Sequence, residues 1–243
     1  MIDSLIIGTG EVGKSLTNVL LKKKVSKLTV VANKDNTQDD FEEVLSEGCK
    51  TLHICFPFSV MFITDVVKYI KIAKPKLVVI HSTVKVGTTS KINNKVNSLV
   101  VHSPVRGVHP HLEKGLLTFV KYIGTESDWA YKKATQEMSN ITCERMRKPE
   151  NTELGKLLST SYYGVCISWH REMAKICKKF DVKFADAATR FNETYNEGYK
   201  DFKPNVVRPT LTPPTGKIGG HCVAQNAKLL RKQLKSIFLD LIK

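Results

Sequence analysis

The sequence lacks a long hydrophobic run and the features of a secreted protein. No apolar segment approaches the roughly 20 residues that a membrane-spanning helix needs. The N-terminus lacks the basic stretch, long apolar stretch and cleavage site of a signal peptide. The chain has 243 residues, 42% of them hydrophobic, which is enough for a buried core. We expect a soluble, cytoplasmic protein.

Paired cysteines and a metal-binding pattern are missing as well. The six cysteines include no CxxC pair and no regular spacing, so we predict free thiols that are mostly buried. The histidines around His109-Pro-His111 have no third ligand at helical or hairpin spacing. We therefore predict no metal site.

Acidic residues are few, with 23 Asp and Glu against 38 Lys and Arg, which gives a net charge of +15. Such an excess is typical of nucleic-acid binders, membrane-surface proteins and enzymes for anionic substrates. Here the basic residues are spread along the chain, which favours solvated helix faces over a dedicated polyanion stripe. We expect a small anionic substrate and no membrane, and keep nucleic acid only as a minor alternative.

What is present is an alternation of β-rich runs and helical segments up to about residue 125. The expected strands are Ser4–Ile7, Leu28–Ala32, Leu52–Cys55, Leu77–His81, Leu99–His102 and Val120–Ile123, with helices such as 14–23, 60–72 and 88–96 between them. This order predicts an α/β fold with a Rossmann-type doubly wound parallel sheet, which binds ligands at the carboxyl ends of its strands. We assign this dinucleotide-binding domain to residues 1–148.

From residue 149 to 243 the pattern becomes all-helical. One long helical pattern covers 151–180, a second covers 185–199, and a last helix begins at about Val223 after a loop rich in proline and glycine. We predict a domain for substrate binding and dimerisation, with a homodimer formed through the 151–180 helix.

A glycine motif follows the first expected strand and opens a helix. It consists of Gly8, Thr9, Gly10, Glu11, Val12 and Gly13. The first glycine permits a tight turn, the second lets a pyrophosphate approach the backbone, and the third lets helix and strand pack closely. The motif predicts a nicotinamide-dinucleotide site.

The second expected strand ends in Ala32, where an acidic residue would bind the ribose hydroxyls of NAD. Asn33 and Lys34 follow it, and a nearby cation favours the 2′-phosphate of NADP. Asp35 complicates this preference, so NAD or NADP remains open with a lean towards NADP. Phe56 and Pro57 follow the third strand and could line the adenine or ribose, with ordinary packing equally compatible.

Two later segments suggest chemistry. Cys222 lies at the expected start of a helix, beside Gly220 and His221, where the helix dipole favours a thiolate and the glycines leave room for a substrate. His221 could assist the thiol or bind substrate. Lys156 and Thr160 lie four residues apart on one helical face.

These motifs together resemble the UDP-glucose/GDP-mannose dehydrogenase family, and most closely its UDP-N-acetylmannosamine/UDP-N-acetylglucosamine 6-dehydrogenase branch. The resemblance is carried by the Gly8–Gly13 turn, His81-Ser-Thr-Val84, Ser103-Pro-Val-Arg106, the Glu153–Lys156 helix and Gly219-Gly-His-Cys-Val-Ala224. The chain is similar to a short form without the family's C-terminal nucleotide-sugar-binding domain.

The resemblance implies oxidation of a primary alcohol of a sugar or nucleotide sugar through a thiohemiacetal and thioester. Cys222 would be the nucleophile, Lys156 would handle the proton or oxyanion, and Thr83, after Ser82, would lie beside the nicotinamide. Arg106 would contact substrate.

The departures from the family pattern leave alternatives open. Val105 replaces a glutamate, Thr160 an asparagine and Asn226 an aspartate, so the reaction could stop short of the acid. One alternative is a reductase of the β-hydroxyacid dehydrogenase type that uses Lys156. Another is a non-catalytic relative that only binds the cofactor.

Overall fold

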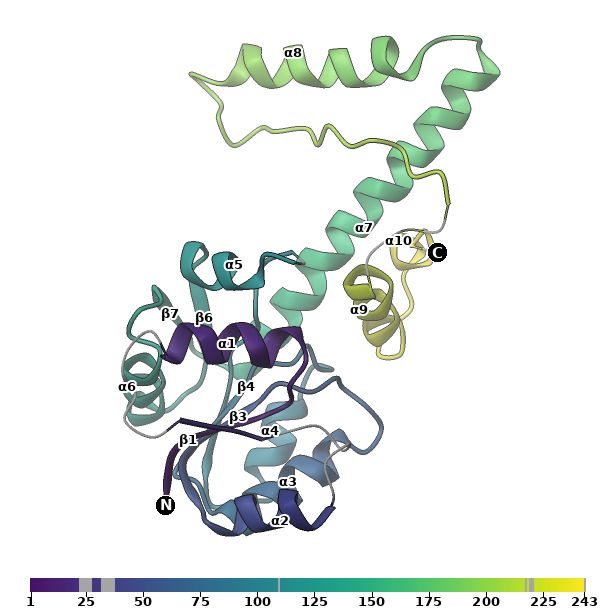
Figure 1. The fold of residues 1–243 in the computed structure, drawn as a ribbon. Coiled ribbons are helices and arrows are strands. Elements are labelled where there is room, and N and C mark those ends of the chain that lie inside the picture. The colour runs from purple at the N-terminus through teal and green to yellow at the C-terminus, as the bar shows by residue number, and fades with distance from the viewer. Residues whose placement is uncertain (22–27, 32–37, 109, 217, 219–220, 243) are drawn as a thin grey trace. The chain divides into compact units, whose positions relative to one another are not determined.

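The computed structural model describes residues 1–21, 28–31, 38–108, 110–216, 218 and 221–242 (Figure 1). Its contacts divide the chain into two compact units, Met1–Lys156 and Leu157–Lys243. No helix of the described residues is both long and apolar enough to cross a membrane.

The first unit is built around a seven-stranded sheet in the order β2-β1-β3-β4-β5-β6-β7. The strands are β1 (Ile2–Ile7), β2 (Leu28–Val31), β3 (Cys49–Ile54), β4 (Leu77–Ile80), β5 (Leu99–His102), β6 (Lys121–Gly124) and β7 (Cys143–Met146). The strands β1 to β5 are parallel. β6 runs antiparallel to β5 and parallel to β7. The Rossmann-type α/β fold is confirmed, and the antiparallel β6–β7 edge is a feature that the strand pattern did not predict.

Helices cover both faces of this sheet because alternate strand residues are apolar on both sides. They are α1 (Glu11–Leu21), α2 (Gln38–Ser46), α3 (Phe62–Ala73), α4 (Thr88–Asn93), α5 (Leu112–Thr118) and α6 (Asp128–Glu137). In β4, Val78 and Ile80 join the core under α2, α3 and α4, whereas Leu77 and Val79 join the core under α1, α5 and α6. A strand buried on both faces is typical of parallel sheets.

The sequence pattern missed α6 because its buried residues include only two alanines, Ala130 and Ala134, which give a weak apolar stripe. Ser127 marks the start of this helix, since its side chain accepts a hydrogen bond from the Ala130 backbone N–H at 3.2 Å.

The long helix predicted over 151–180 is α7 (Pro149–Lys179), whose proline stands in the first turn. The other helical segments are the π-helix η1 (Ala185–Thr189), α8 (Arg190–Tyr199), α9 (His221–Arg231) and α10 (Ile237–Asp240). Within the second unit, α7 packs closely at Gly164, where a Cβ would lie 2.7 Å from Val223 and 2.9 Å from Ile242. The helical domain with one long helix is thus confirmed.

Candidate cofactor and catalytic site

The glycine motif lies at the topological switch point of the sheet. The chain passes from β1 to β2 on one side, then crosses back to β3 on the other side of β1. In open α/β sheets, ligands bind in the crevice outside the carboxyl ends of the strands at such a point. Gly8 and Gly10 follow β1 here, and Glu11 begins α1, so the helix N-terminus lies at the carboxyl end of β1 (Figure 1).

The three glycines have different surroundings, and these match the roles expected for a pyrophosphate turn. Gly8 has φ +114°, and a Cβ there would lie 2.9 Å from the Cys55 backbone. A Cβ at Gly13 would lie 1.8 Å from the Gly8 carbonyl oxygen. At Gly10, by contrast, no described residue beyond its chain neighbours has an atom within 4 Å of the Cβ position. Two glycines therefore serve the protein's own packing, whereas Gly10 leaves space, which fits a ligand at the backbone.

Ser82 joins the ends of β3 and β4 at this crevice, since its hydroxyl donates to the Phe56 carbonyl at 2.6 Å. Phe56 itself packs against Phe62 with ring centroids 5.0 Å apart, as ordinary core packing requires. Pro57 is exposed and Thr83 is half-buried. Asn33 and Lys34, the residues expected to select the cofactor, lie outside the described residues.

Lys156 and Glu153 both contact loops at the carboxyl ends of the strands. The Lys156 ammonium donates to the Val105 carbonyl at 2.9 Å. Glu153 accepts hydrogen bonds from the Gly87 and Thr89 backbone N–H groups, at 2.6 and 2.8 Å, and from the Thr89 hydroxyl at 2.7 Å. Burial raises the pKa of Glu153. The glutamate fixes the turn that begins α4 and the first helical turns that carry Lys156.

A buried polar chain, which sequence reasoning missed, crosses the sheet beside this edge. His53 in β3 contacts His81 after β4, with Nδ1 and Nε2 3.0 Å apart, and its other nitrogen lies 3.3 Å from Glu137. His81 Nδ1 lies 3.1 Å from the Ser103 carbonyl. Since a carbonyl only accepts, His81 Nδ1 carries the proton. Burial lowers the pKa of His81, and it lowers that of His102 to about 3, so both rings are neutral.

Arg106 follows this edge on an exposed loop. Its guanidinium lies over the rings of Phe119 and Tyr122, 5.1 and 5.5 Å from their centroids. Such stacking orients the side chain while its N–H donors stay available to an anion.

In the second unit the structure brings two expected catalytic residues together. The Asn226 side-chain amide donates to the Thr160 hydroxyl at 3.1 Å, and that hydroxyl donates to the Leu157 carbonyl at 3.1 Å. Asn226 is buried. Both positions depart from the family pattern, and the two form one neutral contact.

Cys222 is the second residue of α9, which begins two residues before the expected start, and the cysteine is exposed. An exposed sulfur in the first turn of a helix is accessible to a substrate and can act as a nucleophile. Gly220 lies outside the described residues, and of His221 only the backbone is described, as the first residue of α9.

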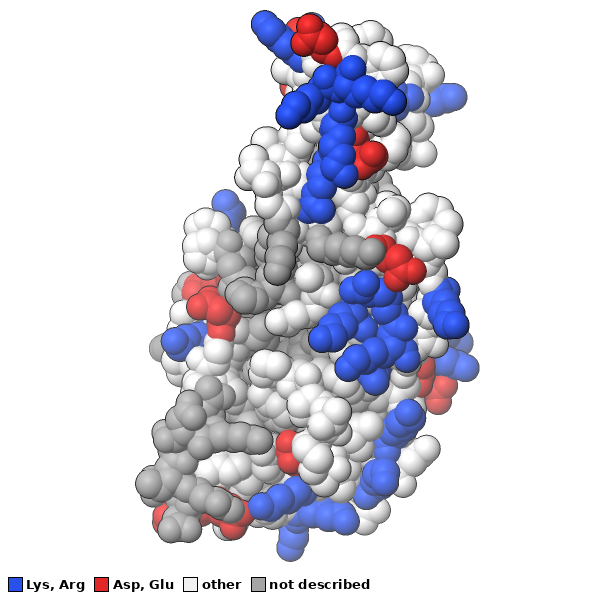
Figure 2. Space-filling view, turned by 90° about the vertical axis from the view of Figure 1, so that its right-hand side faces the viewer, with Lys and Arg blue, Asp and Glu red and all other residues white. Residues whose placement is uncertain are grey.

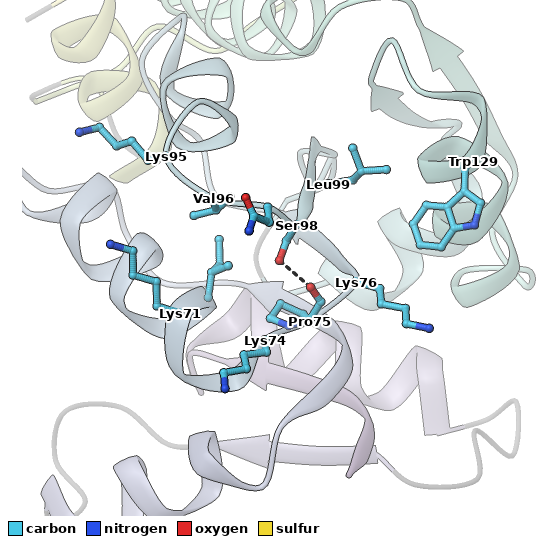
Figure 3. A pocket seen from close by; sticks show the side chains of 11 residues that line it. Lys71, Lys74, Pro75, Lys76, Lys95, Val96, Ser98, Leu99 and Trp129 are labelled. Atoms are coloured by element: carbon cyan, nitrogen blue, oxygen red, sulfur yellow. Dashed lines mark hydrogen bonds between the residues drawn. The ribbon is translucent and has the colours of Figure 1, made fainter.

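The opposite, amino-terminal edge of the sheet carries a cavity of about 680 Å³. Its charged residues are Lys71, Lys74, Lys76 and Lys95, and Trp129 lies at its rim. Figure 3 shows that Lys71 and Lys95 extend to one side, Lys76 to the opposite side and Lys74 away from both, so the four ammonium groups do not converge over the neutral floor that includes Pro75 and Ser98. Divergent, exposed ammonium groups do not form a binding site for one compact anion.

Figure 2 shows the Lys and Arg side chains of one face in several separate groups, with neutral residues between them. Among the described residues, no cluster of three or more His, Cys, Asp or Glu is arranged to hold a metal ion.

Comparisons with known proteins find likeness at the level of structure. No family model and no curated protein matches the sequence. The UDP-D-ManNAc dehydrogenase from Pyrococcus horikoshii superposes with a TM-score of 0.77 at 18% identity, over 99% of this chain and 68% of that one. A UDP-glucose dehydrogenase from Pyrobaculum islandicum gives 0.72 at 16% identity, over 100% and 67%. The Mycobacterium tuberculosis 3-hydroxyisobutyrate dehydrogenase gives 0.66 at 13% identity, over 99% and 91%.

At these identities the likeness shows the fold alone. The chain spans about two thirds of the length of the two nucleotide-sugar dehydrogenases and nearly all of the 3-hydroxyisobutyrate dehydrogenase.

Proposed function

We propose that this chain is an NAD(P)-dependent oxidoreductase that acts on a CH–OH group of a small anionic substrate. The observation that carries the proposal is the unequal packing of the three glycines at the switch point. Gly8 and Gly13 are closely packed while Gly10 is exposed and open, which is the arrangement expected where a pyrophosphate approaches the backbone at the second glycine.

When bound, the nicotinamide cofactor supplies a hydride acceptor for the carbon that carries the hydroxyl group. Gly8–Gly13 and the start of α1 would hold its pyrophosphate, with Ser82 and Thr83 beside the nicotinamide. Lys156, placed by Val105, would take the hydroxyl proton or stabilise the oxyanion. Arg106 would bind an anionic group of the substrate.

We further propose that Cys222 adds to the aldehyde formed in the first oxidation, with Gly220 and His221 beside the substrate. The S–C bond forms as the carbonyl electrons move to oxygen, giving a thiohemiacetal. Hydrolysis of a later thioester needs an activated water. Val105 and the Thr160–Asn226 contact offer no carboxylate for this step, so we propose a reaction that stops short of the acid.

The test measures cofactor binding and turnover separately. Thermal unfolding with NAD and with NADP reports binding, and we expect the larger stabilisation with NADP. Absorbance of the reduced nicotinamide is then followed with a panel of nucleotide sugars, free sugars and hydroxy acids. Cys222→Ala should abolish the second hydride transfer, which follows addition of the thiol to the aldehyde and yields a second reduced nicotinamide. Cys166→Ala, a change of a half-buried cysteine in α7, should leave it unchanged.

A second candidate is a β-hydroxyacid dehydrogenase-type enzyme that uses Lys156 and not Cys222. It is favoured by the 91% coverage of the 3-hydroxyisobutyrate dehydrogenase. Full turnover of a hydroxy acid by Cys222→Ala would establish this candidate over the first. Cofactor binding with no turnover on any substrate would leave a non-catalytic relative.

We also propose a homodimer formed through α7. Its exposed face carries large apolar side chains at helical spacing, namely Leu158, Tyr162, Trp169 and Ile176, and Phe180 follows directly after its end. Light scattering coupled to size exclusion should give twice the chain mass, and Trp169→Glu should give the monomer.

A further inference from the structure

Lys121 is a lysine at a core position of the sheet. It begins β6 and shares a face with Ile123, and it is only 3% exposed. Its ammonium donates to the Ser103 carbonyl at 2.7 Å and to the Pro104 carbonyl at 3.3 Å. A buried ammonium is unfavourable compared with an apolar side chain of similar size, so its presence here calls for a reason other than stability.

The carbonyls that Lys121 binds continue directly into the one that Lys156 binds. Ser103, Pro104 and Val105 present three consecutive carbonyls, the first two to Lys121 and the third to Lys156. Ser103 O also accepts from His81. Donors from β6, from the end of β4 and from α7 thus hold one short segment.

We infer that Lys121 is a positioning residue for Lys156, and that through this shared carbonyl segment its charge sets the proton affinity of Lys156. The inference rests on the proposed function, in which Lys156 handles the proton. It adds to that function that the charge of Lys121 controls the residue that handles the proton.

Several titratable groups surround the Lys121 ammonium, from different elements. They are Cys55 after β3, His81 after β4, His102 in β5, Cys143 in β7 and Lys156 in α7. Burial and, to a smaller extent, the charge of Lys156 lower the pKa of Lys121 to about 7, against the opposing effect of Cys143 and Cys55. Lys121 therefore changes charge near neutral pH, and the two lysines oppose each other's protonation.

The test follows the rate at which an amine reagent modifies Lys156, read by mass spectrometry across pH, in wild type, Lys121→Arg and Lys121→Met. A charged neighbour lowers the proton affinity of Lys156 and so speeds labelling. At pH 6 we expect wild type and Lys121→Arg to be labelled about three- to tenfold faster than Lys121→Met. At pH 8.5, the labelling rate of wild type should equal that of Lys121→Met, and Lys121→Arg should still be labelled about three- to tenfold faster than both.

Lys132→Met, an exposed lysine change in α6, is the matched control and should follow wild type throughout. The inference would be overturned if the labelling rate of Lys156 depended on pH in the same way in wild type and in all variants. If Lys121→Met does not fold, the labelling rates of Lys121→Arg and wild type are compared alone. A faster rate for Lys121→Arg above pH 7 supports the inference, and equal rates overturn it.

Turnover distinguishes this inference from the proposed function. Where the enzyme is active, kcat should change near pH 7 in wild type and not in Lys121→Arg. If the wild-type labelling rate moves from that of Lys121→Arg to that of Lys121→Met while no substrate is turned over, the proposed function is refuted and the coupling of the two lysines is retained.

Discussion

The two edges of the sheet in the first unit differ in how charge is used. At the amino edge, four exposed lysines surround a cavity, and none forms an ion pair with another described residue. At the carboxyl edge, the charged and titratable groups are buried or bonded to specific atoms, as Lys121, Lys156 and Glu153 are. The amino edge thus has more exposed charge, but its charged side chains have fewer fixed contacts than those of the carboxyl edge.

This difference shows why net charge is a poor guide to the site in this protein. A solvated lysine has no fixed partner and retains its freedom, whereas an ammonium bonded to named carbonyls has a fixed position. The proposed function involves the carboxyl edge, and we expect changes there to have the larger effects.

The largest effect is expected for Gly13→Ala. The new Cβ would lie 1.8 Å from the Gly8 carbonyl oxygen, so the free energy of unfolding should fall by about 3 kcal/mol or more. Urea unfolding measures this. Gly10→Ala is the control, since it should leave unfolding within about 0.5 kcal/mol yet weaken dinucleotide binding at least about tenfold. Equal effects of both substitutions on unfolding would remove the distinction between packing and ligand glycines.

Glu153→Ala should lower the free energy of unfolding by about 2–4 kcal/mol, because it leaves three donors of the Gly87–Thr89 turn without an acceptor. Glu150→Ala, which removes one acceptor from the Ser90 hydroxyl, should cost about 1 kcal/mol or less. Chemical denaturation of both variants compares them, and an equal loss would mean that the buried carboxylate has no special role.

Stability should rise with pH between about 7 and 9. The folded state holds the pKa of Lys121 near 7, below its ordinary value of 10.5. The unfolded chain therefore binds more protons in this window, and the free energy of unfolding rises by at most about 1.4 kcal/mol per pH unit. Above about pH 9 it should fall again, because burial raises the pKa of both Cys55 and Cys49 to about 12, and the loss from two thiols exceeds the gain from one lysine. The rise should be absent in Lys121→Met, and its persistence there would assign it to another group.

The smallest effect is expected at the amino edge. Changing Lys71, Lys74, Lys76 and Lys95 together to Gln removes four positive charges near the cavity. Because these side chains are exposed and unpaired among the described residues, each should change unfolding by less than about 0.5 kcal/mol. Cofactor affinity should change less than about twofold at physiological salt. A large loss of binding in the same titration would reverse the comparison between the edges.

Local sequence patterns predicted the elements that hold most of this architecture. The alternation of apolar runs located β1 to β6, and the apolar repeat after residue 150 located α7. β7 and α6 were missed because a short edge strand and an alanine-lined helix carry weak periodicity. The glycine motif lies between β1 and α1, as the sequence predicted, and its binding of a dinucleotide stays a prediction.

The sequence by itself determined which segments become strands and helices and where the glycine turn must lie, since those choices depend on neighbours a few residues apart. Only the tertiary structure decided that Lys121 is buried, that His53 meets His81 and that Asn226 meets Thr160. These contacts join residues from 28 to 66 positions apart, and periodicity along one segment contains no information about which segment will pack against it.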